Sequence, residues 1–176
     1  SPVQLTNSGT AAGGVSDPAV LPGTRLLIVH YQASSQSPAS VGAFDLDTAQ
    51  LDALTPADAS GHASANRSGT AIAYGKGGAG TVALKPFQGG LWGAQSNLML
   101  PMTPAARSAD DPRYGAVQTI HWDYPEWAGD RRLVVSVQGG DNASHSTYSL
   151  SRLAMVELDP GLAQQAGVNY VGRTLE

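Results

Sequence analysis

Short apolar stretches alternate along the whole chain with clusters of glycine, proline, serine, asparagine and aspartate. The most apolar run, residues 26–29, has the length of a single strand. Apolar segments that are too short for helices and are separated by turn-forming residues are typical of β-strands. Only residues 159–167 predict a short helical turn, with Pro160 suited to its first position. We therefore expect an almost all-β structure with many short strands.

A glycine turn followed by an apolar or β-branched run occurs three times, with the turns at Gly23, Gly69 and Gly129. Two further elements recur in the same order: a Leu-Thr-like segment at residues 3–7, 54–57 and 102–105, and an apolar-acidic segment at residues 44–47 and 156–159. Several features repeated in one order predict units of about 40 to 50 residues with four strands each. We assign these units to residues 15–58, 59–107 and 108–174, with residues 1–7 as the outer strand of a preceding unit.

These blocks resemble the TolB-type, WD40-like repeat of β-propeller proteins. Residues 125–136, which read Pro-Glu-Trp-Ala-Gly-Asp-Arg-Arg-Leu-Val-Val-Ser, are similar to the turn and following strand of that repeat, and residues 66–74 match it more loosely. The resemblance implies an all-β fold of propeller blades, each a four-stranded antiparallel sheet. It also implies an extracytoplasmic bacterial protein that is periplasmic, on the cell surface or secreted. The alternative fold is a β-sandwich in which unrelated hairpins look alike.

Three blades are too few to close a ring, because propellers have about four to eight. We therefore expect further blades, from the same or another chain, or a protein partner to complete the fold, so that the chain is not a free monomer. The repeat alignment also predicts that Ile28, Ile72 and Val134 are buried in equivalent strands.

Composition excludes several classes of function. Charged residues make up 14% of the chain and the formal net charge is −4, without any run of lysine or arginine. Binding to nucleic acid through phosphate neutralisation is therefore not expected. The chain has no cysteine, which excludes disulfides, thiolate metal ligands and a cysteine nucleophile. No apolar stretch approaches the roughly 18 residues of a membrane-spanning helix.

Catalytic motifs are absent from the sequence. There is no Gly-x-Ser-x-Gly segment, and the histidines at positions 30, 62, 121 and 145 do not have metal-ligand spacing. The glycine-rich residues 75–80 lack the order of a phosphate-binding loop, and a hairpin loop explains them better. We expect no catalytic residue, no metal and no cofactor.

The most distinctive local feature is the aromatic cluster Trp122, Tyr124 and Trp127. We expect Trp127, at the blade turn, to pack between blades, although tryptophan and tyrosine are also favoured anchors at interfaces. In the resembling family, the segment that enters the inner strand lines the mouth of the central channel. By position, this implies a candidate binding surface of His62, His121, Trp122, Asp123 and Tyr124.

The function that we predict from these observations is a non-catalytic protein-interaction or scaffold module. Two alternatives stay open. One is an accessory propeller domain of an enzyme, such as a prolyl-oligopeptidase-like peptidase or an extracytoplasmic redox complex. The other is a carbohydrate-binding β-sandwich.

Overall fold

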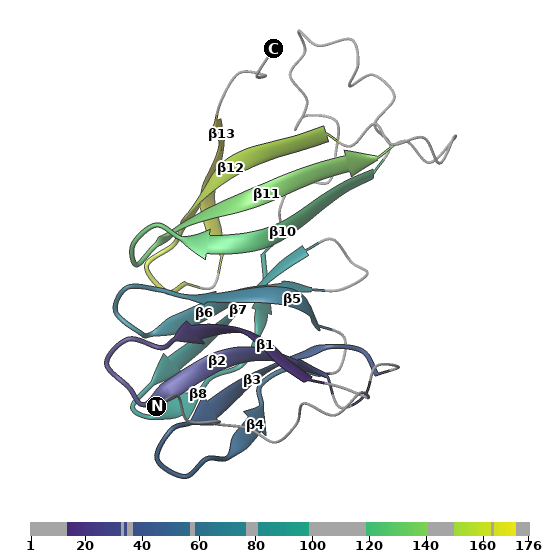
Figure 1. The fold of residues 1–176 in the computed structure, drawn as a ribbon. Coiled ribbons are helices and arrows are strands. Elements are labelled where there is room, and N and C mark those ends of the chain that lie inside the picture. The colour runs from purple at the N-terminus through teal and green to yellow at the C-terminus, as the bar shows by residue number, and fades with distance from the viewer. Residues whose placement is uncertain are drawn as a thin grey trace, which may run out of the picture.

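The computed structural model describes residues 14–32, 34, 37–56, 59–76, 81–98, 119–140, 150–162 and 164–171, and all their regular secondary structure is β-strand. The strands form three antiparallel sheets, arranged one after another in the order of the chain (Figure 1). The all-β prediction is therefore confirmed.

Each sheet is a meander of consecutive strands. The first sheet has β1 (Gly14–Val20), β2 (Leu26–Gln32), β3 (Ser40–Asp45) and β4 (Leu51–Ala53). The second has β5 (Ala59–Ala65), β6 (Ala71–Lys76), β7 (Thr81–Gln88) and β8 (Leu91–Trp92), with β9 (Ser96–Asn97) also paired to β7. The third has β10 (Thr119–Trp127), β11 (Arg132–Gly140), β12 (Leu150–Leu158) and β13 (Gln165–Val171). The expected strand at residues 3–6 and the segment 102–105 lie outside the described residues.

The glycine turns seen in the sequence connect the first two strands of each sheet. Gly23, Gly69 and Gly129 have φ angles of +74°, +69° and +113°, a region that glycine enters without the steric cost of a Cβ atom. This geometry accounts for the recurrence of glycine at the same place in each repeat.

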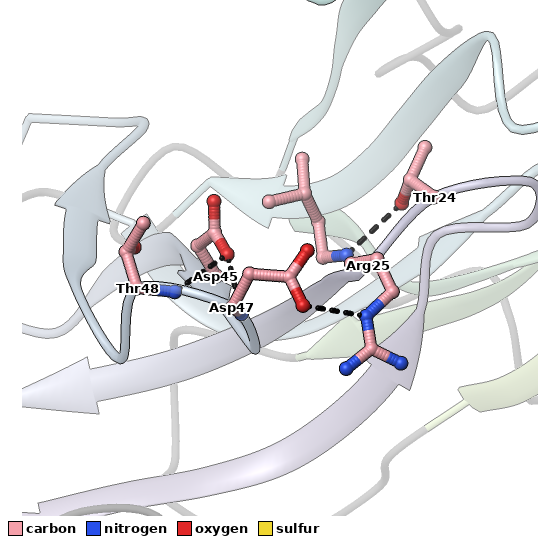
Figure 2. A network of polar contacts seen from close by, with 6 residues as sticks. Thr24, Arg25, Asp45, Asp47 and Thr48 are labelled. Carbon is pink, nitrogen blue, oxygen red and sulfur yellow. Dashed lines mark hydrogen bonds and ion pairs between the residues drawn. The ribbon is translucent and has the colours of Figure 1, made fainter.

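Polar contacts tie the two turns at one end of the first sheet to each other (Figure 2). Arg25 Nε donates to Asp47 Oδ1 at 2.9 Å, which joins the β1–β2 turn to the β3–β4 turn. Asp45 Oδ1 accepts the backbone N–H groups of Asp47 at 2.7 Å and Thr48 at 3.2 Å. The acidic residues of segment 44–47 therefore build a turn and join it to the neighbouring turn.

The Leu-Thr element at residues 54–55 closes the first sheet. The Leu54 N–H donates to the Val41 carbonyl, and the buried Thr55 Oγ1 accepts the Val41 N–H, each at 2.9 Å. Without these partners the backbone groups of Val41 would lie buried and unsatisfied.

The second sheet is buried on both faces. On β6, Ile72 and Tyr74 belong to the core shared with the first sheet, whereas Ala73 belongs to the core shared with the third sheet. Side chains of a strand alternate between the two faces, so β6 contributes to both cores in turn. This alternation explains why the strand is apolar at every position from 71 to 74.

The strand pairing corrects one part of the repeat alignment. The last pairs before the three glycine turns are Val20 with Leu27, Ala65 with Ile72 and Trp127 with Leu133. Ile72 is therefore equivalent to Leu27 and Leu133, and Ile28 is equivalent to Val134. Ile28 and Ile72 are fully buried as predicted, but Val134 is only partly buried. Val134 lies on the face of β11 turned away from the second sheet, because its neighbours Leu133 and Val135 form the inner face.

In segment 159–167, the described residues 159–162 and 164–167 do not form the predicted helical turn. Asp159 makes a tight turn, in which its carboxylate accepts the Gln164 N–H at 3.0 Å and its carbonyl accepts the Leu162 N–H at 3.0 Å. Gln165 and Gly167 then pair with β12 as the start of β13. Ladder hydrogen bonds to an existing strand replace the helical ones in this segment.

The described residues include no helix of the length and apolarity needed to cross a lipid bilayer.

Candidate functional site

The first strand of each sheet is an edge strand, and β5 lies between β1 and β10. Of the five residues expected at a binding surface, His62 lies on β5, and His121, Trp122, Asp123 and Tyr124 lie on β10. The His62 and Tyr124 rings are neighbours, with centroids 6.2 Å apart. The structure thus brings together two of these residues from separate repeats. The side chain of His121 lies outside the described part of the chain.

Trp122 is a core residue and does not belong to an exposed surface. It is 1% exposed and packs with Leu133 and Val135 in the core between the second and third sheets. The alternation of side chains along β10 turns Trp122 inward and places Asp123 on the opposite face. This is a departure from the expected binding surface, because an interface anchor must reach solvent.

Trp127 packs between two sheets, as predicted. It is partly buried against the core of the third sheet, and its Nε1 donates to the Ser64 carbonyl on β5 at 3.2 Å. In the opposite direction, the Ser64 Oγ on β5 donates to the Pro125 carbonyl on β10 at 2.7 Å. These two hydrogen bonds hold β5 and β10 in a fixed relation.

β1 and β10 contain the same irregularity at equivalent places. Their pairing register shifts between Ser16 and Ala19 in β1, and between Asp123 and Glu126 in β10. A proline lies in each break, and the residue before it, Asp17 or Tyr124, has a φ of +49°. Proline has no N–H to donate, so a bulge is a natural place for it. Asp17 and Tyr124 are both exposed as a result.

Asp123 stabilises the bulge of β10. Its Oδ1 accepts the Tyr124 N–H at 2.8 Å, and the side chain is only partly exposed. Its role in the structure is therefore to support the backbone next to the positive φ angle.

A groove of about 460 Å³ lies where the three first strands meet. β1 and β5 form its walls, and Glu126 from β10 closes one side; the lining residues are Asp17, Pro18, Ala19, Val20, His62, Ala63, Ser64, Ala65 and Glu126. Each sheet contributes to it, so the groove exists only when the three sheets are assembled.

His62 and Glu126 form the central polar contact of the groove. His62 Nε2 hydrogen-bonds Glu126 Oε1, and the two side chains are 32% and 59% exposed. The pair gains little from burial, since both partners keep contact with solvent. The carboxylate is held in position and still accessible to a ligand.

The geometry of the groove does not fit catalysis by a serine nucleophile. Ser64 is buried, and its hydroxyl hydrogen points to the Pro125 carbonyl, whereas a nucleophile needs its oxygen close to a base. In the described portions of the chain, no three histidine, aspartate or glutamate residues are grouped so that they could hold a metal ion. The groove therefore offers accessible carboxylates and an imidazole, and the exposed Tyr124 ring lies beside this imidazole.

Asp17 and Glu126 are functional candidates that reasoning from the sequence missed. They are 109 positions apart in the chain, and nothing in either local segment marks them as acidic binding residues. The sequence nevertheless contained an indication that these two segments are equivalent. Asp17-Pro18 and Tyr124-Pro125 both precede a glycine turn by a few residues. The shared X-Pro step could have indicated equivalent bulges.

Comparison with known proteins gives no further assignment. No family model matches the chain, and no curated protein matches it significantly.

Proposed function

We propose that this chain forms part of a β-propeller and acts as a non-catalytic protein-interaction module of an extracytoplasmic protein. The observation that carries the proposal is the convergence of the three first strands on one groove lined by accessible polar side chains. In a propeller, the first strands of the blades surround the central axis, and the mouth of the channel binds partners.

The direction of packing between the sheets supports a propeller over a sandwich. Ile28 of the first sheet packs against the second sheet, and the equivalent Ala73 of the second packs against the third. Ile72 and its equivalent Leu133 both pack against the preceding sheet. Equivalent positions thus face the same way around the series, as in a ring of blades. A two-sheet sandwich buries one inner face of each sheet and has no middle sheet.

The outer face of the third sheet fits a further blade of the same four-stranded type. On this face Leu153 is 51% exposed, and Val134 and Met155 are partly buried. The corresponding faces of the first and second sheets are covered by the sheet that follows them. The next blade, supplied by another part of the polypeptide or by a partner chain, would continue this series of interfaces.

A three-blade series would be expected to leave one apolar sheet face bare at each end, but the first sheet does not. Val29 and Phe44, on the outer face of the first sheet, are 2% and 4% exposed. The need for an added blade is therefore greater at the third sheet.

Light scattering and native mass spectrometry of the whole chain test this proposal. We expect self-association or a co-purifying polypeptide, with at least about 1,000 Å² buried in a specific contact. A monodisperse monomer that binds no partner and no hydrophobic dye would contradict the proposal, because the third sheet would then need no further blade.

A further inference from the structure

We propose that the groove between β1, β5 and β10 binds an arginine side chain of a protein partner. This inference rests on the proposed function, and it adds the chemical class of ligand at the site.

The charge of the groove favours a cation. Two carboxylates line it, Asp17 from β1 and Glu126 from β10, and both residues are exposed. The described lining contains no lysine or arginine that could neutralise them. An anionic ligand would be repelled by both carboxylates, whereas a cation would be attracted by both.

The Glu126 carboxylate is positioned to accept a second hydrogen bond. His62 occupies Oε1, and an ionised carboxylate offers about four acceptor sites on its two oxygens. The contact with His62 orients the Glu126 carboxylate and leaves its other acceptor sites available. A ligand therefore meets a fixed acceptor, and the Glu126 side chain loses less conformational entropy on binding.

The remaining walls suit the aliphatic part of a long basic side chain. Pro18 and Val20 line the groove and are exposed, and the partly buried Ala19 and Ala65 extend this apolar surface. Val20 is 63% exposed, so this apolar surface is open to a ligand. Long basic side chains bury their methylene stem on such a surface while the charged head stays in a polar environment.

Arginine fits better than lysine because of Tyr124. This ring is 56% exposed, and its centroid is 6.2 Å from that of His62, which lines the groove. A planar guanidinium can stack on an aromatic ring and donate to carboxylates in the plane of its fork. The ammonium of lysine is a compact charge without a planar fork.

The three-dimensional contacts also argue against a bound metal ion. In the described residues, no group of three or more potential metal ligands comes together, and His62 directs its Nε2 to Glu126. A divalent cation would need several ligand oxygens or nitrogens around one point. The groove spreads its polar groups over three strands instead.

NMR titration of the ¹⁵N-labelled whole chain with blocked pentapeptides tests the inference. The probes are Ac-Gly-Gly-Arg-Gly-Gly-NH₂ and its analogues with lysine, glutamate or norleucine at the third position. We expect saturable amide shifts at residues 17, 19, 20, 62–65 and 126 with the arginine peptide, and weaker binding at higher ionic strength. Asp17→Asn and Glu126→Gln should each weaken binding about two- to fivefold, the effect of losing a partly exposed ion pair. Asp52→Asn, an exposed aspartate on β4, is the matched control and should leave binding unchanged.

Each other outcome is decisive. Equal binding of the norleucine or glutamate peptide would overturn the inference and leave the groove as an interaction site for another class of ligand. Equal binding of the lysine peptide would overturn the preference for arginine. If no peptide shifts the groove residues, the inference fails, while the association measured by light scattering still decides the proposed function by itself.

Discussion

Gly69 lies directly against the carbonyl group of Pro22: a Cβ atom added to this glycine would be 2.0 Å from Pro22 O. The two residues belong to the glycine turns of the first and second sheets, so these turns pack on each other. The next pair of turns is also joined, because Asp130 Oδ1 accepts the Ser68 N–H at 2.7 Å. The glycine turn of each sheet thus contacts the glycine turn of the next sheet.

Gly69→Ala should destabilise the chain more than Gly23→Ala. Both glycines have positive φ angles, which cost an alanine about 1–2 kcal/mol. At Gly23 an added Cβ meets nothing within 4 Å, whereas at Gly69 it meets backbone atoms that must shift. We expect a total loss of about 2–4 kcal/mol for Gly69→Ala. Urea denaturation of both variants measures the difference, and equal losses would show that the turns do not pack as described.

Asn66→Ala should cost about 2–4 kcal/mol of unfolding free energy. Asn66 is fully buried, and its Oδ1 accepts the backbone N–H groups of Thr70 at 2.8 Å and Ala71 at 3.0 Å. Alanine would remove the acceptor for both N–H groups at the start of β6. Arg67→Ala, which changes the exposed neighbour, is the control and should alter stability by less than about 0.5 kcal/mol. Thermal or urea unfolding followed by circular dichroism distinguishes these outcomes.

Ile72→Ala and Val134→Ala should have unequal effects in the isolated chain. Ile72 is fully buried between the first two sheets, so its truncation should cost about 2–5 kcal/mol. Val134 is partly buried on the outer face of the third sheet, and its truncation should cost no more than about 1 kcal/mol. Comparable losses at both positions would mean that the strand register of β11 is different.

Leu153→Glu should prevent the association expected at the third sheet without unfolding the chain. A buried glutamate at a sheet interface carries a large desolvation cost, whereas on a free surface it is tolerated. Leu91→Glu is the matched control, because Leu91 is 76% exposed on β8 and Leu153 is 51% exposed on β12. Light scattering should report loss of association for Leu153→Glu only. Loss in both variants, or in neither, would contradict a blade interface on the third sheet.

The local pattern of the sequence predicted the hairpins around the three glycine turns. The strand-sized apolar runs and the glycines at 23, 69 and 129 predict hairpins, and the structure has strands on both sides of each glycine. The prediction of these hairpins is correct because a hairpin depends on backbone preferences within a few residues. The segment 159–167 was predicted less well, since pairing with β12 outweighed its weak preference for a helical turn.

Only the tertiary structure decided which face of each strand is covered and which side chains meet. In strands that are apolar on both faces, the sequence does not indicate which side packs against which sheet. The inward position of Trp122 and the outward position of Val134 therefore became visible only with the register of the third sheet. His62 and Glu126 are 64 positions apart and meet only because β5 and β10 pack together. The glycine turns and the hairpins around them were determined by interactions between near neighbours in the chain, whereas the groove depends on how three complete sheets pack.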